Sequence, residues 1–163
     1  MLRKSVFASL LSIGLVIAAS LVVVSKSATP TPDSDKDAVL KVLMLEAESI
    51  EKNDIDSLNK IWSPDDSVLI FENGGIDKGW KNYRDHHLAP ELRAFKNTKF
   101  SISDAVVSVD HDTAWATYRY SLDADYKERK IESKGLGTMV FEKTNGKWLI
   151  VHSHTSRSRK PAS

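Results

Sequence analysis

Two histidines near the end of the chain, His152 and His154, are the residues whose type and spacing most invite chemistry. They lie in residues 146–156, which are predicted to form a β-strand, and successive side chains of a strand point to opposite faces. This alternation places both histidines on one face with Trp148 and Ile150. Buried polar groups are costly without partners, so we expect the two imidazoles either to line a ligand cavity or to be satisfied within the core.

A metal site on this His-x-His pair is the less favoured interpretation. Two imidazoles on one strand face supply two ligands, whereas protein zinc sites use at least three protein ligands. Glu72, His87 or Asp123 would have to complete the site from distant parts of the sequence. The chain has no cysteine, which excludes disulfides, a thiol nucleophile and thiolate ligands. We therefore predict neither a metal nor a cofactor.

Arg119 is the second candidate, because it shares a predicted strand face with the aromatic residue Trp115. A guanidinium group binds carboxylates in a bidentate geometry, so Arg119 is a candidate anchor for an anionic ligand. The structural alternative is an ion pair with Glu72 or Glu142 that only joins neighbouring strands.

Aromatic residues and one further histidine supply the remaining candidates. Trp80, Tyr83 and His87 are spaced i, i+3, i+7, which places them on one face of a helix. Core packing is the expectation for Trp80, while Tyr83 and His87 could equally pack in the core or contact a ligand. Trp62 and Phe71 are expected to form apolar wall.

The charge of the chain argues against nucleic acid as a partner. The net charge is +1, with 23 basic and 22 acidic residues. Three of the basic residues, Arg3, Lys4 and Lys26, belong to the N-terminal segment, so the remainder is about neutral. Binding to nucleic acid requires a basic face that neutralises phosphates.

The N-terminal segment is typical of a secretory signal. Arg3 and Lys4 precede an uncharged run over residues 6–24, and small residues allow cleavage after Ser20 or Ser27. The run is also close to the length that spans a bilayer, so an uncleaved anchor is the alternative. The basic residues precede the run, which predicts export of the domain in either case. The membrane is a partner only if the segment stays uncleaved.

Four segments follow from these patterns. Residues 1–28 are the predicted signal peptide or anchor, and the proline-containing residues 29–36 are a linker. Residues 37–156 form one folded domain, and residues 157–163 form a basic, solvated tail.

Within the domain, the hydrophobic pattern changes from helical spacing to alternation near Lys99. The expected elements are a helix capped at Ser34 or Asp35 and ending near Lys52, a short helix capped by Asp54, a strand over residues 67–71, a third helix capped by Asp77, and long strands from Lys99 onward. The parity of the apolar residues changes at Asp104-Ala105, which predicts a β-bulge, and Gly135 and Gly137 suggest sites of close approach. The fold class is α+β, with helices on one face of a curved, mostly antiparallel sheet.

Three stretches resemble the nuclear transport factor 2-like superfamily, in particular its SnoaL-like and calcium/calmodulin-dependent kinase II association-domain-like branch. They are Phe71-Glu72 before a glycine turn, Arg119 in the long strand, and the closing Asn-Gly-Lys-Trp-Leu-Ile-Val-His-Ser-His-Thr-Ser of residues 145–156. The resemblance implies a cone-shaped fold in which His152, His154 and Arg119 face a cavity under the third helix. Met139 stands where the kinase domain has a second arginine.

The resulting hypothesis is an exported protein that binds a small polar or anionic organic molecule. Apolar residues on both faces of the late strands predict a homodimer or larger homo-oligomer through the sheet. One alternative is an isomerase, cyclase or dehydratase with a cavity histidine or carboxylate as general base. The other is a ligand-free interaction module.

Overall fold

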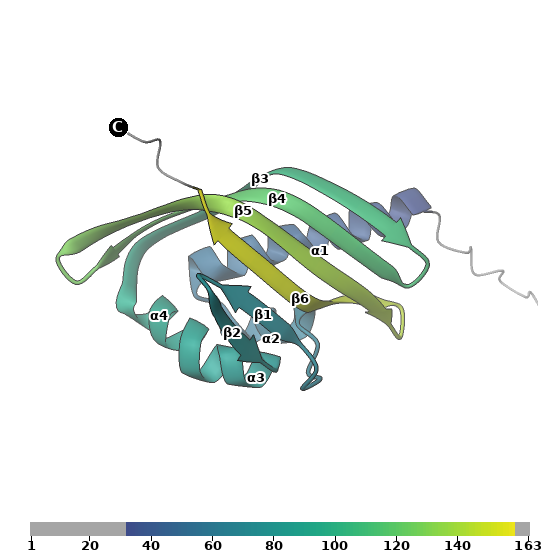
Figure 1. Ribbon diagram of the computed structural model, residues 1–163, viewed down its shortest axis with the longest axis horizontal. Helices are drawn as coiled ribbons and strands as arrows, with labels where there is room; N and C mark the ends of the chain where they lie inside the picture. The colour runs from purple at the N-terminus through teal and green to yellow at the C-terminus, as the bar shows by residue number, and fades with distance from the viewer. Residues whose placement is uncertain (1–31, 159–163) are drawn as a thin grey trace, which may run out of the picture.

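A computed structural model describes residues 32–158 of the chain, which form helices packed against one curved six-stranded sheet (Figure 1). The elements are α1 (Pro32–Lys52), α2 (Ile55–Ile61), β1 (Leu69–Glu72), β2 (Gly75–Lys78), α3 (Trp80–Tyr83), the π-helical turn η1 (Arg84–Leu88), α4 (Ala89–Ala94), β3 (Phe95–Asp110), β4 (Thr113–Tyr126), β5 (Arg129–Thr144) and β6 (Lys147–Arg157). The predicted signal peptide or anchor lies outside the described residues. None of the helices within residues 32–158 has the length and apolarity needed to cross a membrane.

The sheet has the strand order β2-β1-β6-β5-β4-β3. All neighbouring strands are antiparallel except β1 and β6, which run parallel. The long strands β3 to β6 curve over α1, which crosses one face of the sheet, while α3, η1 and α4 lie beside the short β1–β2 hairpin (Figure 1). The predicted α+β class, with helices on a mostly antiparallel sheet, is confirmed.

Helix α1 packs on the sheet through the apolar stripe expected from its sequence. Val39, Leu43 and Ala47 are buried in the core, because residues three or four apart share one helical face. Asp35, a predicted cap, instead contacts the last hairpin. Its Oδ1 accepts hydrogen bonds from Lys143 Nζ at 2.6 Å and Trp148 Nε1 at 3.2 Å. The Lys143 hydrogen bond holds the pKa of Asp35 below its ordinary value and joins the start of α1 to the sheet.

The second helix begins where the sequence predicts, but the third does not. Asp54 caps α2 by accepting a hydrogen bond from the Ser57 backbone N–H at 3.0 Å. Asp77, the predicted cap of the third helix, lies instead in β2, a strand that the sequence analysis missed. Helical structure begins one turn later, after Gly79 at φ 76°, and continues without a break through α3, η1 and α4.

Besides a register shift between Lys96 and Lys99 of β3, two β-bulges interrupt the long strands and re-aim their side chains. The first is the predicted one: Ser103 pairs with Arg119 and Val106 with Thr117, so the register shifts across Asp104-Ala105. The second was not predicted. In β6, Ile150 pairs with Phe141 and His152 with Val140, which leaves Val151 as an extra residue. A bulge inserts one residue into one strand and re-aims the side chains that follow.

Glycines of β5 make room for two tyrosines of β4. A Cβ atom on Gly137 would lie 2.3 Å from the Tyr118 ring, and one on Gly135 would lie 2.6 Å from the Tyr120 ring. Such distances are far below a carbon–carbon contact of about 3.5–4.0 Å. The predicted close approach is therefore present, and it brings both rings over the covered face of the sheet.

Candidate functional site

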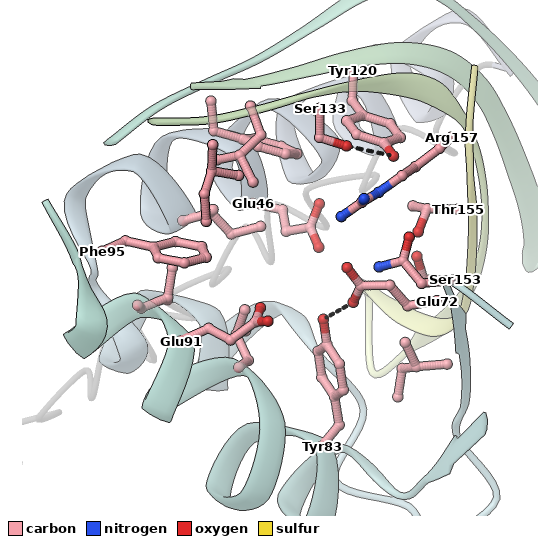
Figure 2. Close-up of a pocket in the computed structure, with 18 of the residues that line it drawn as sticks. Glu46, Glu72, Tyr83, Glu91, Phe95, Tyr120, Ser133, Ser153, Thr155 and Arg157 are labelled. Carbon is pink, nitrogen blue, oxygen red and sulfur yellow. Dashed lines mark hydrogen bonds between the residues drawn. The ribbon is translucent and has the colours of Figure 1, made fainter. Parts of the chain in front are cut away.

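A cavity of about 510 Å³ lies between the covered face of the sheet, α1 and the helical segment α3–η1–α4. Half of its lining residues are apolar: Ile50, Trp62, Ile70, Leu88, Pro90, Leu92, Ala94, Phe95, Phe100, Leu122, Ile131 and Met139. The polar lining residues are Glu46, Glu72, Asn73, Tyr83, Glu91, Tyr118, Tyr120, Tyr126, Ser133, Ser153, Thr155 and Arg157. The side chains of ten of the lining residues are labelled in Figure 2.

Glu46 is a buried carboxyl group that points into the cavity (Figure 2). It lies on the inner face of α1, next to Ala47 and one turn from Leu43, and is only 5% exposed. Within residues 32–158 no hydrogen bond is made to its carboxyl group. Burial, and then the nearby Glu72 carboxylate, raise the pKa of Glu46 to about 8. At neutral pH this residue is therefore mostly the uncharged acid.

Glu72 and Tyr83 form a hydrogen-bonded pair on the opposite wall. Tyr83 Oη donates to Glu72 Oε2 at 2.9 Å (Figure 2). Burial raises the pKa of the Tyr83 hydroxyl well above its ordinary value, and the Glu72 and Glu46 carboxyls add to the effect. Glu72 points inward because it follows Ile70 by two residues on β1, and Ile70 is in the core. The phenol remains a proton donor in this setting.

His87 lies directly behind this pair and does not line the cavity. Its Nδ1 is 3.0 Å from Asp77 Oδ2, and its Nε2 is 3.9 Å from both Glu72 Oε2 and Glu91 Oε1. Burial lowers the pKa of His87, but the Asp77 hydrogen bond and the carboxylates of Glu72 and Glu91 outweigh burial, so the pKa is raised. Among the described residues, no group of three or more His, Asp or Glu side chains is arranged to hold a metal ion.

Arg157 supplies the positive charge at the cavity. It is the last residue of β6, and its exposed side chain turns into the cavity (Figure 2). Burial and Glu72 raise the pKa of Glu91, whereas His87 and Arg157 oppose that rise. The prediction that Arg157 belongs to a solvated tail is wrong, because β6 continues one residue beyond the expected end of the domain.

The structure places His152, His154 and Phe71 on the outer face of the sheet. The bulge at Val151 is the reason for the two histidines, whereas Phe71 points outward because it alternates on β1 with the buried Ile70. Trp148 and Ile150 are buried, but after the extra residue Ser153, Thr155 and Arg157 face the cavity instead of the histidines. The His152 ring lies edge-on to Phe71, with ring centroids 5.1 Å apart, and its Nδ1 is 2.8 Å from the Leu69 carbonyl oxygen. The Phe71 and His154 rings also meet edge-on.

Arg119 and Trp115 also lie outside the cavity. They alternate on β4 with Ala114, Ala116 and Tyr118, which are buried. Arg119 Nε is 3.2 Å from Asp104 Oδ2 at the bulge of β3, and both side chains are mostly exposed. The predicted cavity placement is thus wrong for these two residues, as it is for His152, His154 and Phe71. Of the eight candidates only Trp62 and Tyr83 line the cavity.

The cavity carboxyls were missed by sequence reasoning, although the sequence carries a signal for one of them. The residue with such a signal is Glu46. It follows Val39 by seven residues and Leu43 by three, so it falls on the apolar stripe. A carboxyl group on an apolar stripe indicates a buried polar position. Glu91 has no comparable signal, because its placement depends on the π-helical turn before it.

Comparison with known proteins assigns the chain to a family. A family model described as the SnoaL-like domain matches residues 39–159, more than half of the chain. The chain belongs to the SnoaL-like family. Within the curated proteins no match is found.

Solved structures show that this SnoaL-like protein has the fold of nuclear transport factor 2-like proteins. A superfamily member from Salmonella enterica serovar Typhimurium aligns with a TM-score of 0.75 at 18% identity, over 81% of this chain and 96% of that one. A Streptomyces avermitilis protein proposed to be a dehydratase aligns with a TM-score of 0.71 at 23% identity, over 80% of this chain and 100% of that one. The association domain of calcium/calmodulin-dependent kinase II from C. elegans aligns with a TM-score of 0.61 at 18% identity, over 77% of this chain and 97% of that one. These identities establish the fold.

The buried carboxyl group of Glu46 leads to a prediction about the pH dependence of stability. The folded-state pKa of Glu46, about 8, lies above its ordinary value of 4.5, so the folded protein retains a proton that the unfolded chain loses. Stability contributed by Glu46 is therefore complete below pH 4.5 and decreases as the pH rises to about 8. Glu46→Gln should remove this loss, making the variant more stable than wild type at pH 9 by about 5 kcal/mol, since each pKa unit corresponds to about 1.4 kcal/mol.

Urea unfolding of wild type, Glu46→Gln and the exposed control Glu48→Gln at pH 5, 7 and 9 measures this effect. The control should follow wild type at every pH. If the difference in unfolding free energy between wild type and Glu46→Gln stays the same from pH 5 to 9, a buried, uncharged Glu46 is contradicted.

Proposed function

We propose that this SnoaL-like protein binds a small organic molecule in the cavity under α3–η1–α4. The observation that carries the proposal is the cavity itself, about 510 Å³ with a largely apolar and aromatic wall. Ligand sites in proteins are typically concave, of about 300–1,000 Å³, apolar, and equipped with a few convergent polar groups. A ligand-free interaction module has no need of such a space, because its core would be filled by side chains.

The charges around the cavity favour a ligand without a negative charge. Three carboxyl groups, those of Glu46, Glu72 and Glu91, line it, against the single guanidinium group of Arg157. The expectation of an anionic ligand depended on Arg119, which lies on the outer face of the sheet. The proposal therefore keeps a polar organic ligand and drops the anionic alternative.

Filling part of the cavity should weaken binding without unfolding the protein. Thr155→Phe places a ring into the cavity from β6, whereas Thr113→Phe makes the same change at an exposed position of β4. Excluding several ligand atoms, each worth about 0.3 kcal/mol, should weaken binding about tenfold. Native mass spectrometry of ligand retained through purification, followed by titration of that ligand, measures the effect. Equal affinity for both variants would contradict a ligand in this cavity.

Proton-transfer catalysis is a second candidate function, favoured by the arrangement of Glu46, Glu72 and Tyr83. General acid–base catalysis requires positioned groups that hold or release protons near the working pH. Glu72 is a carboxylate that accepts from the Tyr83 hydroxyl, and Glu46 is an acid with a pKa of about 8. Proteins of this fold from Streptomyces avermitilis and Shewanella frigidimarina are proposed to be a dehydratase and a ketosteroid isomerase. Their likeness supports this class of reaction and identifies no substrate.

Exchange of carbonyl α-protons in D₂O tests the catalytic candidate. A panel of small ketones incubated with wild type and followed by NMR should include compounds whose α-protons exchange faster than in buffer. Glu72→Gln and Tyr83→Phe should each lower that rate about 10²- to 10⁴-fold, while His154→Gln, on the outer face, should leave it unchanged. Equal exchange by Tyr83→Phe and wild type would rule out Tyr83 as the proton donor.

We further propose that the protein is exported and forms a homo-oligomer through the outer face of the sheet. Support for export comes from the N-terminal sequence pattern alone. The assembly is supported by exposed apolar side chains on that face, namely Val106, Trp115 and Leu136.

Fractionation, N-terminal sequencing and light scattering of the recovered protein test this pair of proposals. We expect recovery outside the cytoplasm and a particle of at least two chains. Trp115→Glu should shift it toward the monomer, because a charge in an apolar interface is costly, whereas Lys41→Glu on α1 should not. A monomeric wild type would contradict the assembly, and a cytoplasmic wild type the export.

A further inference from the structure

The two carboxyl groups that face each other across the cavity make no hydrogen bond to a cationic side chain within residues 32–158. Glu46 is 95% buried and points into the cavity without a hydrogen bond in the described part of the chain. Among the residues that the structure describes, Glu72 receives one hydrogen bond, from the neutral Tyr83 hydroxyl, and its Oε2 lies 3.9 Å from His87 Nε2. Arg157 lies at the exposed end of β6, and its charge acts on Glu91, whereas only burial and Glu72 account for the raised pKa of Glu46. Carboxyl oxygens of Glu46 and Glu72 therefore remain available inside the cavity as hydrogen-bond acceptors.

The wall beside these carboxyl groups is aromatic. Phe100 and Tyr120 stack with ring centroids 6.1 Å apart and an interplanar angle of 17°. Tyr118 is 4% exposed and lies close enough to Glu46 for that carboxyl to raise the pKa of the phenol. The faces of aromatic rings carry partial negative charge and attract cations. The carboxyl groups and the aromatic rings therefore both favour a positively charged ligand.

We propose that the cavity takes a small organic amine, with its ammonium group held between the Glu46 and Glu72 carboxyls and its apolar part against Tyr118, Tyr120 and Phe100. The inference rests on the proposed ligand-binding function and specifies the chemical class of the ligand. An ammonium group donates up to three hydrogen bonds, and such bonds to carboxylates are about twice as strong as those between neutral groups. A neutral alcohol supplies one donor, and a carboxylate ligand would face like charges.

Binding of an amine should be coupled to release of a proton. The groups around Glu46 are Glu72 on β1, Tyr83 on α3, Glu91 on α4, Tyr118 on β4 and Arg157 on β6. The tyrosines remain neutral, so an entering ammonium acts chiefly on the carboxyls. A nearby cation favours the charged form of a carboxyl group. Glu46, mostly protonated at pH 7, should therefore lose up to about one proton when the amine binds.

Three probes of matching size test the inference: 2-phenylethylamine, 2-phenylethanol and phenylacetate. Isothermal titration of the purified full-length protein at pH 7, in two buffers of different ionisation enthalpy, measures affinity and proton release. The amine should bind at least tenfold more tightly than the alcohol, with release of a proton, and the carboxylate should bind weakest. Glu46→Gln should weaken amine binding at least tenfold, abolish the proton release and leave the alcohol unaffected. Glu72→Gln should also weaken amine binding. Arg119→Ala, on the outer face of the sheet, should leave amine binding unchanged.

Two results would overturn the amine inference while leaving the proposed binding function intact. One is an alcohol or carboxylate that binds as tightly as the amine. The other is amine affinity unchanged in both Glu46→Gln and Glu72→Gln. If no probe binds wild type and the Thr155→Phe variant of β6 retains the same ligands as wild type, the cavity proposal itself fails. The Glu72→Gln variant keeps the test decisive if Glu46→Gln does not fold.

Discussion

One extra residue in β6, Val151, determines what the cavity contains. The side chains before it, Trp148 and Ile150, are buried in the core by ordinary alternation. The bulge exchanges the two faces, so that Ser153 and Thr155 enter the cavity and the histidines leave it. A shift of one residue reverses every later side chain, because the period of a strand is two. The chemistry of the site therefore depends on a local irregularity in the hydrogen-bond ladder.

The exchange of the two faces of β6 changes which side chains line the cavity and, with them, its charge. The bulge removes His152 and His154 from the cavity, and Arg119 lies outside it for a separate reason, because it alternates on β4 with the buried Ala116 and Tyr118. In the structure these side chains lie on the outer face, and carboxyl groups from α1, β1 and α4 remain. Burial then works on Glu46, since a carboxyl in an apolar wall resists ionisation. The same group that costs stability at high pH is available to bind a cation or to move a proton.

The general architecture could be predicted because it depends on patterns that are local in the sequence. The stripe of Val39, Leu43 and Ala47 indicates a helix with one buried face, and Asp54 with Ser57 shows a capping pattern. The bulge at Asp104 is visible because apolar residues on both sides of it change parity. At Val151 no parity change is visible, because Leu149, Ile150 and Val151 are all apolar and the next residues are polar on both faces. The sequence pattern there fits either register.

The sequence by itself determined the α+β class, the first two helices, the long antiparallel strands with the bulge at Asp104, and the close approach at Gly135 and Gly137. These features follow from periodicity and from glycines such as Gly137, which must lie where a ring approaches the backbone. Only the tertiary structure decided which polar groups share the cavity. Glu46, Glu72 and Arg157 come from the first helix, the first strand and the last strand, and they meet because long-range pairing and one bulge bring them together. Register between distant strands is set by packing, which no local pattern in the sequence specifies.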